Sequence, residues 1–193
     1  WTFQKGADWR HPYGPRSSIT GLDDLPVVHV AFADALAYAS WAGKDLPSEA
    51  EWEFAARGGL EGAEFAWGEE FTPGGRYQAN TWQGELPWQN AKEDGYEWTA
   101  PVGSFPPNGF GLHEMAGNVW EWTSDRYGPY DPRQAADPRG ANIGGTRVIR
   151  GGSWHFDANS ARCGLRYTHA PQDAGFSLGF RVVAEPRTPR RRR

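Results

Sequence analysis

Oxygen-bearing side chains gather in two parts of the sequence at spacings that suit a hard cation. In the first part, Asn80 and Asp94 bracket a loop, ANTWQGELPWQNAKEDGY, whose glycine and proline residues let the backbone turn carbonyl groups inward. In the second part, HEMAGNVWEW, three such side chains surround Gly117: Glu114, Asn118 and Glu121. Calcium takes about six to eight oxygen ligands and mixes carboxylates with backbone carbonyls, so both parts are candidate calcium sites. The alternative is that these residues serve turns and caps, where Asn and Asp are common.

The histidines and the single cysteine make a thinner case for chemistry. The five histidines are scattered: His11, His29, His113, His155 and His169. No His-x-x-x-His or Cys-x-x-Cys pair occurs, so each is better explained as a surface or hydrogen-bonded core residue than as a transition-metal ligand. Cys163 lies beside Arg162 and close to Arg166, which could activate a thiolate, but a half-buried structural cysteine is the favoured interpretation. One cysteine also excludes a disulfide within the chain.

The elements that must position these residues are few and short. From Asp34 to Ala42 the sequence predicts a helix with Asp34 as N-cap and Leu36, Ala39 and Ala42 on one face. LPSEAEWEFAARGG predicts a second helix over 48–57, because Ser48 stands three residues before Glu51 in a capping box and glycines follow. Its apolar face consists of Trp52, Ala55 and Ala56. Residues 26–32 read as a strand or extended lead-in, and 147–154 and 176–185 as the last two strands.

Composition places the chain among loop-rich domains with an aromatic core. With 193 residues, one domain over 1–185 is expected, followed by a disordered basic tail at 186–193. Eleven tryptophans, 25 glycines and 15 prolines accompany only 38% hydrophobic residues, so large aromatics rather than long aliphatic elements should fill the core. The net charge of −4 gives no electrostatic reason to expect nucleic acid, and no apolar run is long enough to span a membrane.

Residues 8 to 184 resemble the formylglycine-generating enzyme family, also called sulfatase-modifying factors. The resemblance rests on several motifs in order, among them DLPVVHVAF, KDLPSEAEWEFAARGG, FGLHEMAGNVWEWTSD, RVIRGGSW and LGFRV. It implies an α+β fold with little regular secondary structure, related to C-type lectins, and two calcium sites. The first site would use Asn80 and Asp94 with the carbonyls of Thr81 and Tyr96. The second would use Glu114 and Glu121 with the carbonyls of Gly117 and Val119, Glu114 replacing an Asn of the enzymes.

The enzymes that this chain resembles bind copper through two cysteines and use oxygen to convert a sulfatase cysteine into an aldehyde. Counted from Gly151, Gly152 and Ser153, their cysteine positions fall at Phe156 and at or near Ala161. Neither side chain can bind Cu(I), which prefers thiolates, so copper and aldehyde formation are not expected. The segment before RCGLR is about three residues shorter than theirs, and the family's disulfide positions hold Ala39 and Val182. The N-terminal strands of family members are also expected to be missing.

Three functional hypotheses follow from this resemblance. The first is a calcium-stabilised module that binds a peptide or protein through a groove, with seven candidate residues: Trp120, Ser153, Trp154, His155, Phe156, Arg166 and Tyr167. Aromatics with an arginine make a reasonable recognition surface, although Trp120 and Trp122 could simply be core. A variant of this hypothesis is a variable protein of a diversity-generating retroelement, diversified between Ser153 and Leu178. The alternatives are a copper or non-haem iron oxidoreductase of the family, or retained formylglycine formation.

Overall fold

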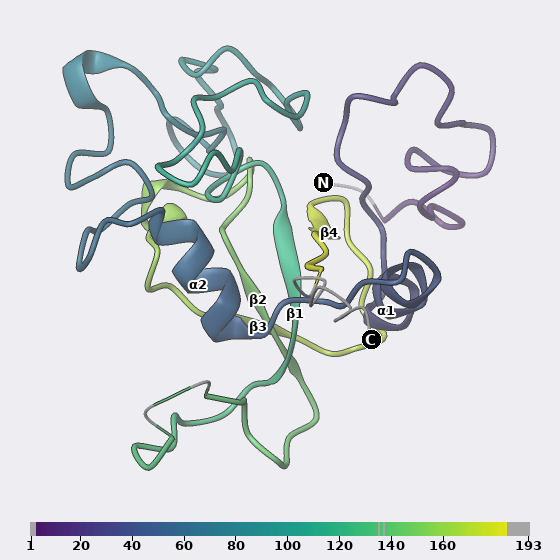
Figure 1. The fold of residues 1–193 in the computed structure, drawn as a ribbon. Coiled ribbons are helices and arrows are strands. Elements are labelled where there is room, and N and C mark those ends of the chain that lie inside the picture. Colours follow the sequence, from purple (N-terminus) through teal and green to yellow (C-terminus); the bar gives the residue numbers. More distant parts are fainter. Residues whose placement is uncertain (1–2, 135, 137, 185–193) are drawn as a thin grey trace, which may run out of the picture.

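The computed structural model describes residues 3–134, 136 and 138–184 (Figure 1). The basic tail expected at 186–193 lies outside the described residues. The regular elements, in chain order, are α1 (Phe32–Trp41), α2 (Glu49–Arg57), the 3₁₀ turn η1 (Pro73–Gly75), β1 (Trp120–Arg126), β2 (Arg147–Arg150), the 3₁₀ turn η2 (Ala158–Ala161), β3 (Tyr167–His169) and β4 (Leu178–Phe180). The expected α+β class with little regular structure is confirmed. Within the part described, no helix is long and apolar enough to cross a membrane.

One small mixed sheet organises the fold, with strand order β3-β2-β1-β4. β1 pairs antiparallel with β2 and parallel with β4, and β2 pairs antiparallel with β3. Helix α2 lies on one side of this sheet and α1 on the other (Figure 1). Because side chains alternate along a strand, Trp120 and Trp122 of β1 face α1 whereas Glu121 faces α2. The sheet therefore separates two environments, an aromatic one and an ionic one.

Both expected helices form, and one begins earlier than predicted. α2 has the predicted capping box: Ser48 Oγ accepts from the Glu51 N–H at 3.2 Å, and the Glu51 carboxylate accepts from the Ser48 N–H at 2.7 Å. α1 starts at Phe32 with Ala31 as N-cap, so the prediction of Asp34 as N-cap was wrong. Asp34 instead lies inside the first turn and accepts from the Ala31 N–H at 3.2 Å. Packing of the Phe32 ring edge-on against Trp122, at 5.8 Å, explains the earlier start.

The strands agree with the sequence only in part. β2 and β4 fall inside the two predicted C-terminal strands, but each is shorter than its predicted range. Residues 26–31 form no strand and lead into α1, with a left-handed backbone at His29 (φ +56°). β1 and β3 were not expected as strands. β1 is buried along both faces at its start, so it lacks the alternation of polar and apolar residues by which a strand is found from sequence.

Three packed clusters make up the core. The largest lies between α1 and the sheet and contains Phe32, Ala35, Trp120, Trp122 and Ile149 among others. A second cluster lies under α2 around Trp52, Ala56, Met115 and Cys163, and a third contains Phe65, Ala79 and Ala161. Trp120 and Trp122 are core residues, as their alternative interpretation anticipated. Of the face expected on α1, Ala39 is buried but Leu36 is 44% exposed, and Phe32 and Ala35 are buried with Ala39.

Side-chain amides replace backbone ladders across much of the irregular chain. The fully buried Asn118 accepts from the Ala100 N–H at 2.9 Å and donates to the Ala100 carbonyl at 3.1 Å. Asn108 donates to the carbonyls of Ala55 and Ala56 at the end of α2, and its oxygen accepts from two backbone N–H groups. Buried backbone groups need partners, and these amides provide a donor and an acceptor together.

Candidate functional site

Part of the predicted groove forms an aromatic surface on the α1 side of the sheet. Tyr167 of β3 is 48% exposed and its ring stacks on Trp120 with centroids 5.6 Å apart. Phe156 meets Trp120 edge-on at 5.6 Å, and His155 touches Phe156 at 4.4 Å. The strand β3 thus carries the exposed ring, while Trp120 supplies a buried floor.

The surface continues away from the sheet through residues that the sequence did not single out. His155 contacts Phe176 at 4.7 Å, and Trp154 contacts Trp98 at 5.1 Å in an edge-on arrangement. Trp98 is 59% exposed and comes from the distant segment EDGYEWTA, so only the fold brings it here. We name this feature the aromatic surface and define it by five residues above two buried tryptophans: Trp98, His155, Phe156, Tyr167 and Phe176, above Trp120 and Trp154.

His155 contributes an uncharged imidazole to this surface. Its Nδ1 lies 3.1 Å from the Oγ of Ser153, a residue that is fully buried. Burial among aromatic rings lowers the pKa of His155 to about 4, because a charged imidazolium is poorly solvated there. At neutral pH the aromatic surface therefore carries no charge from His155. Ser153 shapes the loop from inside and has no exposed hydroxyl to offer a ligand.

The low pKa of His155 predicts acid sensitivity. The folded state holds this histidine with a pKa of about 4, whereas an unfolded chain has a value near 6.5, so the unfolded state binds more protons between them. Stability attributable to His155 is therefore complete above about pH 6.5 and is lost as the pH falls towards 4, by roughly 1–2 kcal/mol after allowance for solvent screening. Urea melts of the protein and of His155→Gln at pH 7 and 5 would measure it. An unchanged pH dependence in the variant would contradict the assignment.

Arg166 does not join the aromatic surface, although it precedes Tyr167 in the chain. Neighbouring residues along an extended backbone face opposite ways, and Arg166 reaches the α2 side. Its Nε and Nη2 donate to the two carboxylate oxygens of Glu49 at 2.6 and 2.7 Å. The rings of Tyr127 and Tyr130 cover its guanidinium at 4.9 and 4.0 Å. The predicted arginine of the groove is thus part of an ion pair that joins β3 to α2.

The two positions that the resemblance assigns to the copper-binding cysteines lie apart from Cys163. Phe156 packs on the large cluster under α1, and Ala161 is buried in the third cluster at the end of η2. Cys163 is buried under α2, where its carbonyl accepts from Arg150 and burial raises the pKa of its thiol. A protonated, buried thiol is a poor nucleophile and a poor metal ligand. The half-buried structural role predicted for Cys163 is close to what the structure shows, with the side chain more deeply buried.

The residues of the first candidate calcium site are brought together. Asp94 Oδ2 accepts from the Thr81 N–H at 3.0 Å, and Oδ1 accepts from the Tyr96 N–H at 3.0 Å. Asn80 is buried next to them and donates to the Trp98 carbonyl at 2.8 Å. The sequence missed Gln83, whose amide nitrogen donates to Asp94 Oδ2 at 2.9 Å and also to the Thr81 carbonyl.

The Gln83 amide tests whether a cation fits this first site. The Gln83 N–H groups point at the Asp94 carboxylate and the Thr81 carbonyl, two of the proposed calcium ligands. These donors therefore lie where a bound cation would lie. A 180° turn of the amide would present its oxygen instead and add a ligand; amide nitrogen and oxygen have the same shape. Asp94 forms no ion pair among the described residues, so its charge is balanced only by N–H groups. The donor set fits a hard cation.

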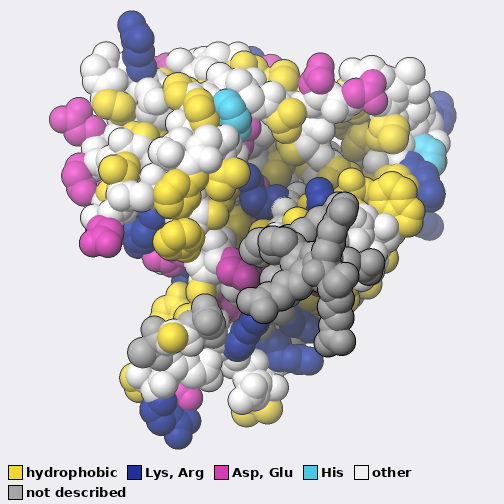
Figure 2. Space-filling model, in the orientation of Figure 1, with side chains coloured by type: hydrophobic (Ala, Val, Ile, Leu, Met, Phe, Trp, Pro, Cys, Tyr) yellow, Lys and Arg dark blue, Asp and Glu magenta, His cyan; other side chains and the backbone are white. Residues whose placement is uncertain are grey.

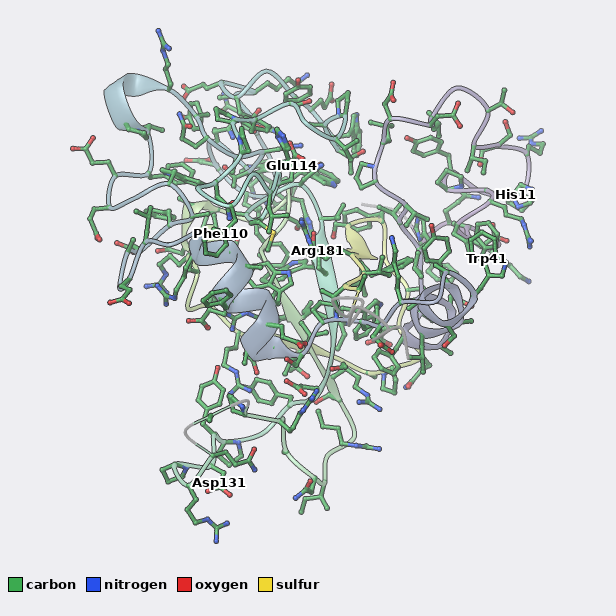
Figure 3. The ribbon with its side chains drawn as sticks, viewed as in Figure 1. His11, Trp41, Phe110, Glu114, Asp131 and Arg181 are labelled. Carbon is green, nitrogen blue, oxygen red and sulfur yellow. The ribbon has the colours of Figure 1, made fainter. Side chains whose placement is uncertain are left out.

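The second candidate site is already served by an arginine. Glu121 is buried, and its two oxygens accept from Nε and Nη2 of Arg181 at 2.6 Å each and from the Trp52 indole at 2.6 Å. Arg181 Nη2 also donates to the carbonyls of His113 and Glu114. In Figure 3 Arg181 lies in the middle of the molecule, below Glu114. A cation at this site would have to share Glu121 with Arg181.

Glu114 itself points to a neighbouring loop. Its carboxylate accepts from the N–H groups of Gly103 and Phe105 at 2.9 and 3.2 Å, which fixes the turn that Phe105 ends. Both acids of the second site line a cleft of about 560 Å³, together with Val119 and Arg181. No three His, Cys, Asp or Glu side chains converge on a metal position in the described ranges, so either calcium site would depend on amide and carbonyl oxygens.

Residues 1–186 match the family described as the sulfatase-modifying factor enzyme 1-like domain. This chain belongs to the sulfatase-modifying factor family. It is 53% identical to the formylglycine-generating enzyme of Streptomyces coelicolor, over 95% of this chain and 60% of that protein. It is also 44% identical to the inactive Cα-formylglycine-generating enzyme 2 of Bos taurus, over 95% of this chain and 58% of that protein. The chain spans about three fifths of the length of these relatives.

Two solved structures have folds similar to that of this sulfatase-modifying factor domain. PvdO from Pseudomonas aeruginosa has a TM-score of 0.67 and 36% identity, with 82% of this chain and 61% of that chain covered. Treponema denticola variable protein 1 has a TM-score of 0.68 at 22% identity, with 93% and 76% covered, and shares the fold. The expected formylglycine-generating-enzyme fold, related to C-type lectins, is thereby confirmed.

Proposed function

We propose that this sulfatase-modifying factor domain is a binding module, which takes an extended peptide or protein segment across its aromatic surface and does not form formylglycine. One observation carries the proposal. Phe156, at the position of the first copper-binding cysteine, is packed between Trp120 and His155 and is part of the recognition surface itself. A residue that would have to be a thiolate for catalysis is here an aromatic contact.

Copper does not fit the residues present. Cu(I) prefers thiolates, Phe156 and Ala161 have none, and the Cys163 thiol lies in a different core cluster with its pKa raised by burial. The iron alternative needs a histidine cluster, and no such group is found among residues 3–134, 136 and 138–184. The described residues therefore offer no metal site for either the copper or the iron oxidase hypothesis. The name of one relative, the inactive Cα-formylglycine-generating enzyme 2 of Bos taurus, describes that protein as inactive.

Aromatic side chains with few charges suit peptide recognition. Tyrosine and tryptophan offer large contact areas with little loss of conformational entropy, and Trp120 and Trp154 hold the exposed rings in place. The diversified-protein variant of the proposal concerns residues between Ser153 and Leu178, which include much of the aromatic surface. A DNA repeat that differs from the 3′ end of the gene only at adenines would identify it.

Calcium completes the proposal as a structural ion. We place the tighter site at Asn80, Thr81, Asp94 and Tyr96, with Gln83 as a further ligand, because the Asp94 charge has no cationic partner there. A second, weaker ion at Glu114 and Glu121 would compete with Arg181. Both would fasten loops that lack backbone ladders, which is how an irregular domain keeps a binding surface rigid.

A panning experiment tests the binding function. A phage-displayed random dodecapeptide library is selected on the protein, and the affinity of the enriched peptides is measured for Tyr167→Ala and for Tyr13→Ala as control. Tyr13 is 68% exposed, lies in the N-terminal segment and is not one of the five residues that define the aromatic surface. Loss of a central aromatic contact typically costs about 2 kcal/mol or more, so Tyr167→Ala should bind roughly 30-fold more weakly. Equal affinity for both variants would overturn the proposal.

The same preparation answers the catalytic question. Incubated with copper, oxygen and a sulfatase-derived cysteine peptide, the protein should produce no aldehyde above a protein-free control. Aldehyde in stoichiometric or larger amount would contradict the loss of activity, whatever the panning result.

A further inference from the structure

Two arginines and a histidine form a row across the sheet, next to the aromatic surface. Arg126 of β1 is the register partner of Arg147 of β2, and Arg147 is the register partner of His169 of β3. Two of them contact the core on the α1 side: the Arg147 guanidinium covers the Phe32 ring at 4.2 Å, and His169 meets Trp122 edge-on at 6.4 Å. We name these three residues the cationic row. Figure 2 shows Lys and Arg side chains grouped at the lower end of the sheet, where strands β1 and β2 lead into their connecting loop.

The two arginines of the row have no ion-pair partner in the part of the chain that the structure describes. Arg126 uses Nη1 to donate to the Gly144 carbonyl at 2.6 Å, and Arg147 uses Nη1 to donate to the Ser124 carbonyl at 2.6 Å. Each guanidinium has five N–H donors, so most of them are left over. Neither arginine forms an ion pair with a carboxylate of the described residues, whereas six other arginines do.

Like charges in directly opposite positions destabilise a sheet. Arg147 is partly buried, and its pKa is lowered first by that burial and then by the nearby Arg126, while Asp125 opposes the shift. Asp125 is buried on the α2 side, where it accepts from the Glu49 N–H at 2.8 Å, so it does not face the row. The carboxylate of Asp173 does contact the row, because it is hydrogen-bonded to His169 at 2.9 Å.

We propose that the cationic row binds an oxyanion of the ligand that crosses the aromatic surface, namely an acidic or phosphorylated side chain of a peptide. This inference rests on the proposed binding function and names the chemistry of its ligand. Two guanidinium groups side by side suit carboxylate and phosphate, which accept paired N–H donors. An anion between Arg126 and Arg147 also offsets the repulsion between their positive charges. The ligand would thus provide the negative charge that these two arginines do not find among the described residues.

The geometry also sets the spacing within the ligand. Tyr167 and His169 are two residues apart on β3, with ring centroids 6.3 Å apart. Arg147 and Arg126 lie one and two strands beyond His169, and neighbouring strands are about 4.8 Å apart, so the acidic residue should lie within a few positions of the residue that contacts Tyr167. The net charge of the chain is −4, so general attraction between the domain and a polyanion is not expected. The basic tail at 186–193 also carries arginines, so the Arg126→Gln variant, and not the net charge, is what assigns anion binding to the row.

Fluorescein-labelled hexaglutamate and hexaglutamine serve as probes, measured by fluorescence anisotropy against the purified protein. The variant is Arg126→Gln, and the matched control is Arg133→Gln, which removes the same charge from an arginine that is 88% exposed in the same β1–β2 connection. We expect hexaglutamate to bind and hexaglutamine not to bind. Arg126→Gln should weaken hexaglutamate binding about tenfold, and Arg133→Gln should change it less than about twofold. A phosphoserine hexapeptide tells which oxyanion is preferred.

Melting curves separate an anion site from a structural pair. At low ionic strength Arg126→Gln should melt at the same or a higher temperature than the parent protein, because a repulsion is removed. Inorganic phosphate, compared with chloride at equal ionic strength, should raise the melting temperature of the parent and not of Arg126→Gln. The proposal is overturned by absence of hexaglutamate binding, by equal weakening in both variants, or by a clear loss of stability in Arg126→Gln.

The two proposals can fail separately. Hexaglutamate has no aromatic residue and is too short to need Tyr167, so its binding is independent of the Tyr167→Ala result. Peptides enriched by panning that lack acidic residues would sink the oxyanion proposal and leave the binding module intact. Hexaglutamate binding together with undiminished peptide affinity in Tyr167→Ala would do the reverse.

Discussion

Replacing Arg150 with alanine is expected to destabilise the domain by about 3–5 kcal/mol, which for this chain length corresponds to a fall in melting temperature of roughly 6–20 °C. Arg150 is fully buried, and its guanidinium donates to Glu49 at 2.8 Å, to Glu53 at 2.6 Å and to the Cys163 carbonyl at 2.5 Å. Removing it leaves the buried Glu49 with Arg166 as its remaining cation. A buried charge that loses a partner cannot be resolvated, and that cost dominates the effect.

The matched control is Arg133→Ala. Arg133 also forms an ion pair, with Asp131 at 2.8 Å, but it is 88% exposed and its loss should shift the melting temperature by less than about 3 °C. Arg150→Lys keeps the charge but not the two-pronged geometry and should fall between the two, which gives a result even if the alanine variant does not fold. Differential scanning calorimetry measures all three. If Arg150→Ala and Arg133→Ala melt alike, the ionic network under α2 is not what joins the helix to the sheet.

Removal of calcium should produce the second large effect. With the metal in about thousandfold excess over its dissociation constant, binding adds about 4 kcal/mol to the folded state, so EDTA should lower the melting temperature by roughly 8–16 °C. The effect should depend on Asp94, the charged member of the first site. Asp94→Asn keeps the shape and removes the charge, and we expect it to melt at the temperature of the EDTA-treated parent protein and to respond little to EDTA.

Glu97→Gln is the control for this experiment. Glu97 lies in the same loop and is paired with Lys92 at the surface, so the variant changes the loop charge equally without touching the site. Its response to EDTA should match that of the parent protein. Elemental analysis accompanies the melts: calcium near one or two ions per chain supports the proposal, and a calcium-free protein with an unchanged melting curve excludes it.

Sequence reasoning succeeded where structure depends on neighbours in the chain. The capping box of α2 involves residues three positions apart, and Gly58 at its end has φ +57°, so local chemistry defines both ends. The start of α1 depends instead on a contact between Phe32 and Trp122, which are 90 positions apart in the sequence numbering and cannot be paired from local patterns. β1 was missed for a related reason. Glu121 is buried against Arg181 and Trp122 against α1, so the strand shows no alternation of exposed and buried residues in its sequence.

The candidate site was predicted in part for the same physical reasons. Motif positions identified Phe156 and Tyr167, which do lie together, and Asn80 and Asp94, which also meet. Arg166 was misplaced because alternation along the strand sends it to the other face, and alternation is visible only once β3 is known. Trp98 and Gln83 were missed because a loop without periodicity carries them.

Glycine at position 117 shows how tightly the two candidate calcium loops are joined. A Cβ atom there would lie 2.3 Å from the Asn80 carbonyl oxygen, and the residue has φ +72°, so only glycine fits. The close approach lets the Asn118 N–H donate to the Asn80 carbonyl at 2.8 Å. The segment that carries the first set of ligands therefore rests directly on the segment that carries the second.

Loss of the Asn108 amide nitrogen would remove two hydrogen bonds at the end of α2. Asn108 precedes Gly109, and an Asn-Gly pair is the dipeptide most prone to spontaneous deamidation. The side-chain nitrogen of Asn108 donates to the carbonyls of Ala55 and Ala56. Deamidation exchanges that donor for an oxygen, which would place a negative charge against the carbonyl end of α2, where the helix dipole is also negative. In this fold, side-chain amides make hydrogen bonds that strand pairing makes elsewhere. Hydrolysis of one such amide would therefore release the end of a helix without breaking a peptide bond.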